Sequence, residues 1–328
     1  MASFVLWRGV SALDNKTAIA AVLVLDSTNR KMTTAEAPSV AQLYIILDNV
    51  HPVEGVKTGQ DAAICGSCPH RYLFDATGEA VEGSRTCYVG MHSVAAVYKA
   101  TSSKPLTPIS DISDGLSKSM LRIGAYGDPL ALPFDLVDEL CNIAGRNSRT
   151  LSRSPRRWTG YTHAWRREDL DPRWSRYVMA SCDTVEDVRT ASALGWRCFY
   201  VANATGDAPV LSVSEDLKLR RCLSDSSVKG ASLTPCSLCR LCYGKEGDED
   251  QALSVFIERH GNGAVKANFA RRDEHAMTGI APVLSRPTGK NSKNKRVLPV
   301  LNEIPAPVFG SEIPSQFLTP HASDRVSA

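Results

Sequence analysis

Apolar residues gather in short runs that alternate with polar segments along most of the chain. The first runs, AIAAVLVL at 18–25 and AQLYIILD at 41–48, are rich in aliphatic residues and predict two buried strands. Farther along, shorter apolar runs are each followed by a segment with helical periodicity. This alternation of strand and helix patterns predicts parallel βαβ units.

The alternation is clearest between residues 91 and 203. Helices are expected where Pro or Thr opens a segment and Gly closes it, as at 133–145 and 184–195, and MHSVAAVYKA at 91–100 is a further expected helix. The expected strands are 120–129, 158–165, 176–184 and 196–203. Together they predict an α/β fold with a parallel sheet that forms a partial or complete (β/α) barrel. An open doubly wound sheet is the alternative.

The pattern divides the chain into three regions. Residues 1–203 form the predicted α/β core. Residues 204–270 contain a cysteine-rich loop, predicted to bind metal, and end in two expected strands at 253–261 and 264–270. From 271 to 328, Pro, Ser, Lys and Asn dominate, which predicts a mostly disordered tail.

Composition adds few constraints on function. Hydrophobic residues make up 43% and charged residues 22% of the 328 positions, as in ordinary globular proteins. The net charge of +3 is too small to indicate a nucleic-acid partner by itself. No apolar run reaches the length of a membrane span, and the N-terminus has no signal-peptide pattern, so we expect a cytoplasmic protein without membrane contact.

Ten cysteines are unusual for a reducing compartment, where clustered thiols bind metal more often than they form disulfides. The densest group is TPCSLCRLCYG, with Cys236, Cys239 and Cys242 at three-residue spacing. Cys222, fourteen residues before Cys236, supplies a fourth thiol. Four thiolates complete a closed zinc site or hold an iron–sulfur cluster. We call these four residues the C-terminal cysteine site.

A second group has three thiols, Cys65, Cys68 and Cys87, and is called the N-terminal cysteine site. Three protein ligands leave a coordination position open for a substrate or cosubstrate. Two alternatives stay open: His70 or His92 closes the coordination shell, or the CxxC turn holds a structural zinc. The remaining thiols fall in expected helices or strands and are expected to pack in the core: Cys141, Cys182 and Cys198.

Polar side chains follow three of the expected strands. RIGAYGDP ends in Asp128, GYTHAWR carries His163, and MASCDT ends in Asp183. Active sites of (β/α) barrels lie at the carboxyl ends of the strands, so we expect these three residues to be catalytic, by orienting a substrate or moving protons. Each aspartate alone also suits a turn. His260, at the end of 253–261, is either a ligand or a polar strand end.

The segment SPRRWTGYTHAWRRED combines arginines with aromatic residues, a pairing found in nucleic-acid-binding proteins. A short basic patch of this kind is more often a solvated face, which is the interpretation that we favour.

Several motifs taken in order resemble a family of largely uncharacterised proteins encoded by bacteriophages and prophages. They are KTGQDAAICGSCPHR, CYV, RIGAYGDP, WTGYTHAWR, VMASCDT and the terminal C…TPCSLCRLCYG…IERHG. The resemblance runs from about residue 5 to 270 and implies the cytoplasm of an infected host as the location. Where that family's last cysteine site opens with Cys-Pro, this chain has Cys222-Leu223.

More distantly, the layout is similar to radical S-adenosylmethionine enzymes, which combine an early three-cysteine loop, a Gly-rich acidic strand end and a partial (β/α) barrel. This resemblance implies that the N-terminal cysteine site holds a four-iron cluster with one iron open. The resemblance also aligns GAYGDP with the Gly-Gly-Glu-Pro strand by which those enzymes contact the amine of the cosubstrate. It therefore implies that four residues of GAYGDP bind the cosubstrate: Gly124, Tyr126, Gly127 and Asp128. Their usual loop is CxxxCxxC, whereas eighteen residues separate Cys68 from Cys87 here.

Three functions therefore compete. The first is an iron–sulfur, radical S-adenosylmethionine-like enzyme of unknown substrate that modifies nucleic acid or nucleotides. The alternative is a zinc-stabilised protein that binds nucleic acid or a host partner without catalysis. The third is a hydrolase that uses Asp128, His163 and Asp183 around a divalent ion.

Overall fold

The computed structural model describes residues 2–26, 32–151, 156–202, 207–225, 233–245 and 252–258. By compactness the chain divides into Met1–Ser285 and Arg286–Ala328, and every described residue belongs to the first unit. His260, the expected strand 264–270 and the predicted tail at 271–328 lie outside the described residues.

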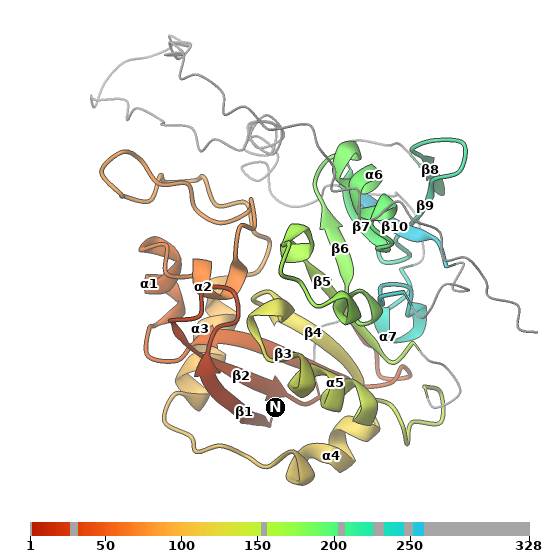
Figure 1. Cartoon of the computed structure of the whole chain (residues 1–328). Helices are drawn as coiled ribbons and strands as arrows, with labels where there is room; N and C mark the ends of the chain where they lie inside the picture. Colours follow the sequence, from red (N-terminus) through yellow and green to blue (C-terminus); the bar gives the residue numbers. More distant parts are fainter. Residues whose placement is uncertain are drawn as a thin grey trace, which may run out of the picture. The chain divides into compact units, whose positions relative to one another are not determined.

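Within the described ranges, ten strands form one open sheet in the order β1-β2-β3-β4-β5-β6-β7-β10-β9-β8 (Figure 1). Strands β1 and β2 pair antiparallel, as do β2 with β3 and β8 with β9, and all other neighbours pair parallel. The strands are β1 (Ser3–Val10), β2 (Ala18–Val24), β3 (Val40–Leu47), β4 (Met120–Tyr126), β5 (Trp158–Thr162), β6 (Met179–Cys182), β7 (Cys198–Ala202), β8 (Val210–Ser212), β9 (Lys218–Arg221) and β10 (Ser254–Glu258).

The α/β class and the parallel pairing of β3 through β7 are thus confirmed. The first predicted strand, β2, runs antiparallel to β3, and β1, which was not expected, precedes it. Sequence SFVLWRGV in β1 carries an arginine and a glycine, so it lacks the unbroken apolar run that marks β2. The expected strand 253–261 is confirmed in its described part as β10, whereas β8 and β9 of the same sheet were not expected.

The helices at 91–100, 133–145 and 184–195 are confirmed as α3, α5 and α6. Helix α6 begins with a capping box. The Thr184 hydroxyl accepts a hydrogen bond from the backbone N–H of Asp187, and the Asp187 carboxylate accepts one from the backbone N–H of Thr184. The helices α1, α2 and α4 were not expected. The bounds are α1 (Pro52–Lys57), α2 (Ala62–Cys65), α3 (Met91–Thr101), α4 (Ile109–Ser117), α5 (Phe134–Ile143), α6 (Val185–Ala193) and α7 (Cys236–Cys239), with short 3₁₀ turns η1 (Pro129–Ala131), η2 (Ala164–Arg166) and η3 (Pro172–Arg176).

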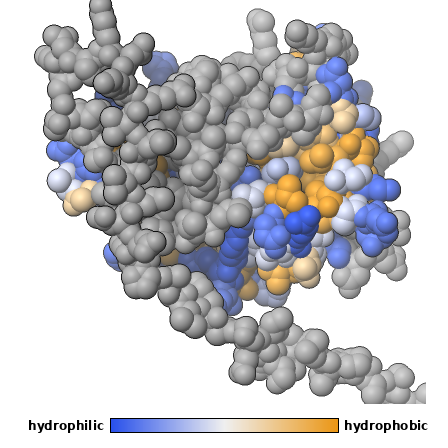
Figure 2. All heavy atoms as spheres, turned by 90° about the horizontal axis from the view of Figure 1, so that it is seen from above, coloured by the Kyte–Doolittle hydropathy of each residue, from blue (hydrophilic) through white to orange (hydrophobic). Residues whose placement is uncertain are grey.

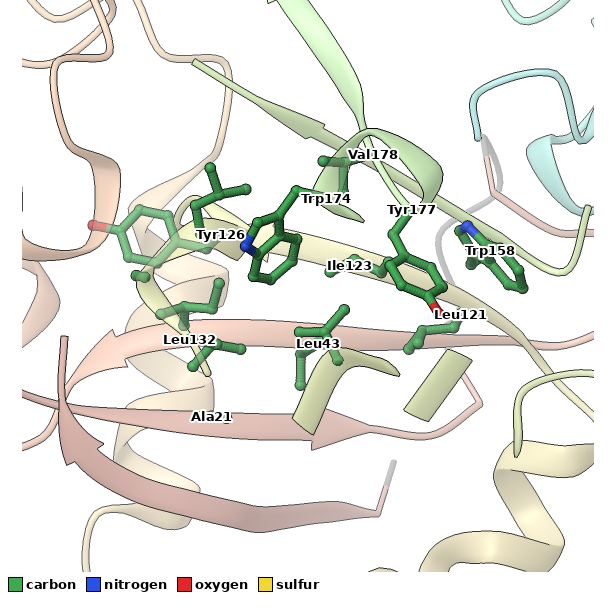
Figure 3. Close-up of a cluster of buried hydrophobic side chains, with 14 of the residues drawn as sticks. Ala21, Leu43, Leu121, Ile123, Tyr126, Leu132, Trp158, Trp174, Tyr177 and Val178 are labelled. Carbon is green, nitrogen blue, oxygen red and sulfur yellow. The ribbon is translucent and has the colours of Figure 1, made fainter. Parts of the chain in front are cut away.

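Much of the main hydrophobic core lies on one face of the central strands, and consecutive residues of β2 add to it on both faces. Leu43, Leu121 and Ile123 are buried there with Trp158, Trp174 and Tyr177, as Figure 3 shows. The rings of Trp158 and Tyr177 lie 5.4 Å apart between centroids, and Val137 and Leu140 of α5 belong to the same cluster. Cys141, Cys182 and Cys198 are fully buried, as expected of core residues.

The second face of the central strands has a different character. Side chains alternate along a strand, so Gln42, Tyr44, Arg122, Tyr161 and Phe199 point away from the core residues that neighbour them. Apart from Gln42, which is 6% exposed, these side chains are half-buried. We call this the aromatic face of the sheet.

The described surface mixes hydrophilic and apolar residues, and in the view from above the apolar ones gather in one area bordered by hydrophilic side chains (Figure 2). Tyr88 is the most exposed of the large apolar side chains, at 74%. Among the described residues, no helix combines the length and the apolar character that crossing a bilayer requires.

Candidate functional site

Three parallel strands deliver polar side chains to the same edge of the sheet. Asp128 follows β4, His163 follows β5 and Asp183 follows β6. Because β4, β5 and β6 pair in parallel, their carboxyl ends lie side by side, and the expected convergence of these residues occurs.

Asp183 joins two histidines that are far apart in the sequence. His70 Nε2 lies 2.9 Å from Asp183 Oδ1, and His163 Nε2 lies 3.1 Å from Asp183 Oδ2. The two imidazole rings meet edge to face with their centroids 5.5 Å apart. Within the described ranges, these side chains are the one set of three potential metal donors whose ligand atoms all lie within 4.8 Å of one another. We call them the His–Asp–His cluster.

The loop that carries the N-terminal cysteine site also holds His70 in place. The carbonyl oxygen of His70 accepts hydrogen bonds from the backbone N–H groups of Thr86 and Cys87, at 3.2 and 3.0 Å. Its ring Nδ1 lies 2.9 Å from the hydroxyl of Thr86. These bonds tie residues 70 and 86–87 together, so Cys87 reaches the neighbourhood of Cys68 despite the long separation in sequence.

The charges in this cluster stabilise each other. Burial works against a charged His163, but Cys68 and Asp183 outweigh it, so the pKa of His163 lies well above its usual value. Burial would also raise the pKa of Asp183, yet His163 and His70 hold it well below the usual range. Cys68 lies close enough to His163 to raise its pKa, so a thiol, an imidazole and a carboxylate are neighbours here.

The three thiols of the N-terminal cysteine site are free and lie close enough to influence one another. Burial, followed by Cys68, Asp61 and Cys87, raises the pKa of Cys65 well above its usual value. Burial also raises the pKa of Cys87; Arg85 opposes this rise and Cys68 adds to it. Cys68 thus disfavours ionisation of both Cys65 and Cys87, and a bound cation would stabilise the thiolates of these two residues.

A glycine turn fixes the position of Cys65. Gly127 has φ +83°, and an added Cβ would lie 2.7 Å from Ile45 Cβ and 3.3 Å from the carbonyl oxygen of Ile64. The next residue, Asp128, donates its backbone N–H to that carbonyl at 2.6 Å. The GAYGDP turn after β4 is therefore packed directly against the helix that ends in Cys65.

Arg71 supports the same loop from the other side. Its guanidinium pairs with Asp61 at 2.7 Å and donates to the carbonyl oxygens of Gly59 and Gly66, at 2.7 and 3.2 Å. Gly66 is the residue that follows Cys65, so the fork of Arg71 holds the CxxC turn onto the helix α2.

Asp128 holds the backbone around His163. Its Oδ2 accepts from the Thr162 hydroxyl at 3.0 Å and from the His163 N–H at 2.9 Å, and its Oδ1 accepts from the Leu130 N–H at 3.0 Å. Asp128 is 6% exposed, and burial raises its pKa above the usual value. The three hydrogen bonds lower the pKa, but their effect is smaller than that of burial. These contacts make Asp128 a positioning residue; the predicted contact with a cosubstrate stays a prediction.

We expect Asp128→Asn to lower the free energy of unfolding by about 1–3 kcal/mol, because an amide NH₂ would face N–H or O–H donors that now meet a carboxylate. Thermal and urea unfolding of the variant measure the loss. Asp169→Asn is the control, since Asp169 is exposed and pairs with Arg167 on the surface. Equal stability of Asp128→Asn and the wild type would contradict the positioning role.

A cavity of about 570 Å³ lies beside the CxxC turn. Gly66 and Ser67 line it from the turn, and Ala164 and Arg167 line it from the segment after His163. Lys16 completes the basic part of the wall. This volume falls in the range of pockets that bind small molecules.

The C-terminal cysteine site assembles elsewhere in the fold. The N–H of Thr234 donates to the carbonyl oxygen of Leu223 at 3.0 Å, which brings Cys222 toward α7. Burial, followed by Cys222, raises the pKa of Cys242 well above its usual value, with Cys236 and Cys239 acting in the same direction. Burial, followed by Cys242, raises the pKa of Tyr161, so these two side chains are neighbours.

Local backbone geometry supports this second site. Helix α7 spans Cys236–Cys239, and the residue that caps its C-terminus, Arg240, has a left-handed backbone conformation with φ +54°. The Cys242 carbonyl then accepts the N–H of Gly160 at 3.3 Å, which attaches the site to β5. The four predicted cysteines are near enough to influence one another, but no three of their sulfurs lie within 4.8 Å of one another in the described residues, and metal binding here stays a prediction.

The two histidines proposed to complete the N-terminal cysteine site, His70 and His92, lie in different surroundings. His70 joins the His–Asp–His cluster, whereas His92 is exposed near the start of α3. The pairing of His70 with Asp183 spans 113 residues, and the sequence offered only its place two residues after Cys68 as a signal. The contacts of Tyr161 with Cys242 and of Tyr88 with Arg122 had no sequence signal.

No family model, no curated protein and no solved structure matches this chain.

Proposed function

We propose that this chain is a metal-dependent enzyme whose centre is the N-terminal cysteine site together with the His–Asp–His cluster, in the form of an iron–sulfur, radical S-adenosylmethionine-like protein. The observation that carries the proposal is the joining of His70 and His163 through Asp183 at the carboxyl edge of the sheet, with Cys68 beside His163. Residues from one loop and two strands meet there, in a half-buried place beside a cavity.

The order of parts along the sheet supports this form of enzyme. The cysteine loop follows β3, the first strand of the parallel series, and the GAYGDP turn follows β4, the second. From β3 to β7 the strands lie in the same order as in the sequence, an order that partial (β/α) barrels share and that lacks the reversal of a doubly wound sheet.

The donor set suits a cluster of several irons. Each cysteine of such a cluster binds a different iron, so the sulfurs stand farther apart than around a single ion. Cys65, Cys68 and Cys87 influence one another yet do not form a set within 4.8 Å in the described structure. Cys65, Cys68 and Cys87 would hold a four-iron cluster with one iron open, and that cluster would supply the reducing electron for chemistry on S-adenosylmethionine.

Other residues of the chain would position the site, bind the cosubstrate and hold a proton. Gly127 lets the GAYGDP turn approach the cysteine loop, and Asp128 holds His163 in place. Lys16 lines the neighbouring cavity and would face the carboxylate of an amino-acid cosubstrate there. His163, with its raised pKa, holds a proton next to the thiols.

A second candidate is a single divalent ion bound by the His–Asp–His cluster. Two histidines and one carboxylate with open positions are typical of non-haem iron sites. The distances of 2.9 and 3.1 Å between the carboxylate oxygens and the imidazole nitrogens favour this candidate.

The alternative without catalysis has less support. The rings of Trp158 and Trp165 are 4% and 2% exposed, so they cannot stack on bases. The arginines next to them are also engaged: Arg166 pairs with Asp187, and Arg167 pairs with Asp169.

Metal analysis of protein purified and reconstituted without oxygen tests the proposal. We expect iron and sulfide, with a visible absorption band that is lost in Cys65→Ala, Cys68→Ala and Cys87→Ala. The control is Cys141→Ala, which removes a buried thiol of α5 outside both cysteine sites. A colourless protein without iron overturns the iron–sulfur form. Iron without sulfide, lost in His70→Ala and kept in Cys87→Ala, would favour the second candidate.

A further inference from the structure

Arg122 stands at the centre of the aromatic face, outside the residues used by the proposed function. Its Nη2 donates to the Tyr88 hydroxyl at 2.9 Å, and its Nη1 lies 3.9 Å from Met32 Sδ. Tyr161 and Tyr44 also lie close enough to influence the charge of its guanidinium. The partner in β3 at the same register is Gln42.

This guanidinium is half-buried, and among the described residues no carboxylate lies within ion-pair distance of it. The contrast with Arg221 is informative, because that buried arginine pairs with Asp225 at 2.7 Å. Burial of an arginine without an anion costs free energy, since a tyrosine hydroxyl replaces only part of its hydration. The geometry therefore favours an anion that comes from outside the chain.

Aromatic rings surround this charge. Tyr161 packs against Phe199 with ring centroids 4.3 Å apart, Tyr44 lies on the neighbouring strand β3, and Tyr88 extends from the cysteine loop. Tyr88 is 74% exposed although its hydroxyl is hydrogen-bonded, so its ring has a free side. A guanidinium binds the oxygens of phosphate or carboxylate in pairs, and tyrosine rings stack on planar groups.

We propose that Arg122, Tyr88, Tyr44 and Tyr161 form a binding site for a small molecule that joins an oxyanion to a planar ring, with nucleoside monophosphates as the preferred class. Tyr88 directly follows Cys87, and Arg122 lies near Cys236. A ligand held here sits between the two cysteine sites. The proposal rests on the sheet face alone and holds whichever metal the cysteines bind.

Equilibrium binding to full-length, metal-replete protein tests the site, with AMP, GMP, CMP and UMP as probes. We expect a dissociation constant of about 1 mM or tighter for at least one of them. Arg122→Gln should weaken binding at least about tenfold, because a charged hydrogen-bond pair is lost, and Arg122→Lys should restore part of it. Tyr88→Ala should weaken binding about fivefold or more through lost stacking. Its exposure means that this variant keeps the fold.

Arg189→Gln is the matched control, since Arg189 lies on the exposed side of α6 and pairs with Glu186. Adenosine, which has the planar ring without the oxyanion, and inorganic phosphate separate the two halves of the ligand. Nucleotide binding that exceeds both supports the proposal, whereas equal binding of phosphate alone overturns the stacking role of Tyr88.

The competing explanation is that Arg122 balances the thiolate charge of the C-terminal cysteine site through Cys236. In that case Arg122→Gln would release metal from the protein and leave nucleotide affinity unchanged. That result, or the absence of nucleotide binding to the wild type at millimolar concentration, overturns the proposal.

Discussion

Replacing Gly127 with alanine is expected to destabilise the protein by about 3–5 kcal/mol and to abolish metal binding at the N-terminal cysteine site. The φ of +83° is strained for any residue with a side chain. In addition, the new Cβ would lie 2.9 Å from the carbonyl oxygen of Ile45 and 2.7 Å from Ile45 Cβ. Both atoms belong to the central strand β3 and cannot move aside without disturbing the core.

The chain offers a matched control for this substitution. Gly195 has φ +82°, almost the same conformation, but a Cβ added there would meet nothing within 4 Å. Gly195→Ala therefore has the conformational cost of about 1–3 kcal/mol without the steric one. Urea unfolding and metal content of the two variants measure the difference. Equal losses of stability, or full metal retention in Gly127→Ala, would contradict the role assigned to the GAYGDP turn.

Removal of metal from the C-terminal cysteine site is expected to have the second largest effect. Helix α7 has four residues, too few for a helix that is stable by itself, and Ser237 is its one buried residue. Little apolar burial therefore holds this segment, and a closed metal site would supply much of its folding free energy. We expect Cys242→Ala, or a strong chelator, to lower the melting temperature by on the order of 10 °C.

Elemental analysis and thermal unfolding check this expectation together. Cys242→Ala should lose the metal of this site, and Cys141→Ala should keep it with a smaller change in melting temperature. Because Tyr161 of β5 is a neighbour of Cys242, tyrosine fluorescence should also change on metal removal. A wild-type protein that contains no metal and is indifferent to chelator would refute a metal at this site.

The secondary structure of the central region could be predicted because each strand there is a short apolar run bounded by turn residues. The strand at 41–48 and the helix at 184–195 illustrate this, since burial and capping act on neighbouring residues. The strand β1 could not be predicted in the same way. Its stability comes from pairing with β2 and from packing on the core, which local sequence does not encode.

For the candidate site, the sequence identified residue types and their strand-end positions. Cys65, Cys68 and Cys87 were grouped by spacing, and Asp128, His163 and Asp183 were grouped by their place after strands. That these two groups lie next to each other in the fold was not predictable, because it depends on which strands are neighbours in the sheet. His70 meets Asp183 only because the cysteine loop after β3 reaches across the ends of β4 and β5 to β6.

The sequence by itself determined the α/β class, the run of parallel strands and the two cysteine groups, because hydrophobic periodicity and ligand spacing are local properties. Tertiary structure alone decided that Asp128 binds the backbone of His163, that Asp183 lies between two histidines, and that Arg122 faces tyrosines rather than a carboxylate. Those contacts join residues up to 113 positions apart. Parallel pairing places the strand ends side by side, and burial then strengthens the interactions between their charges.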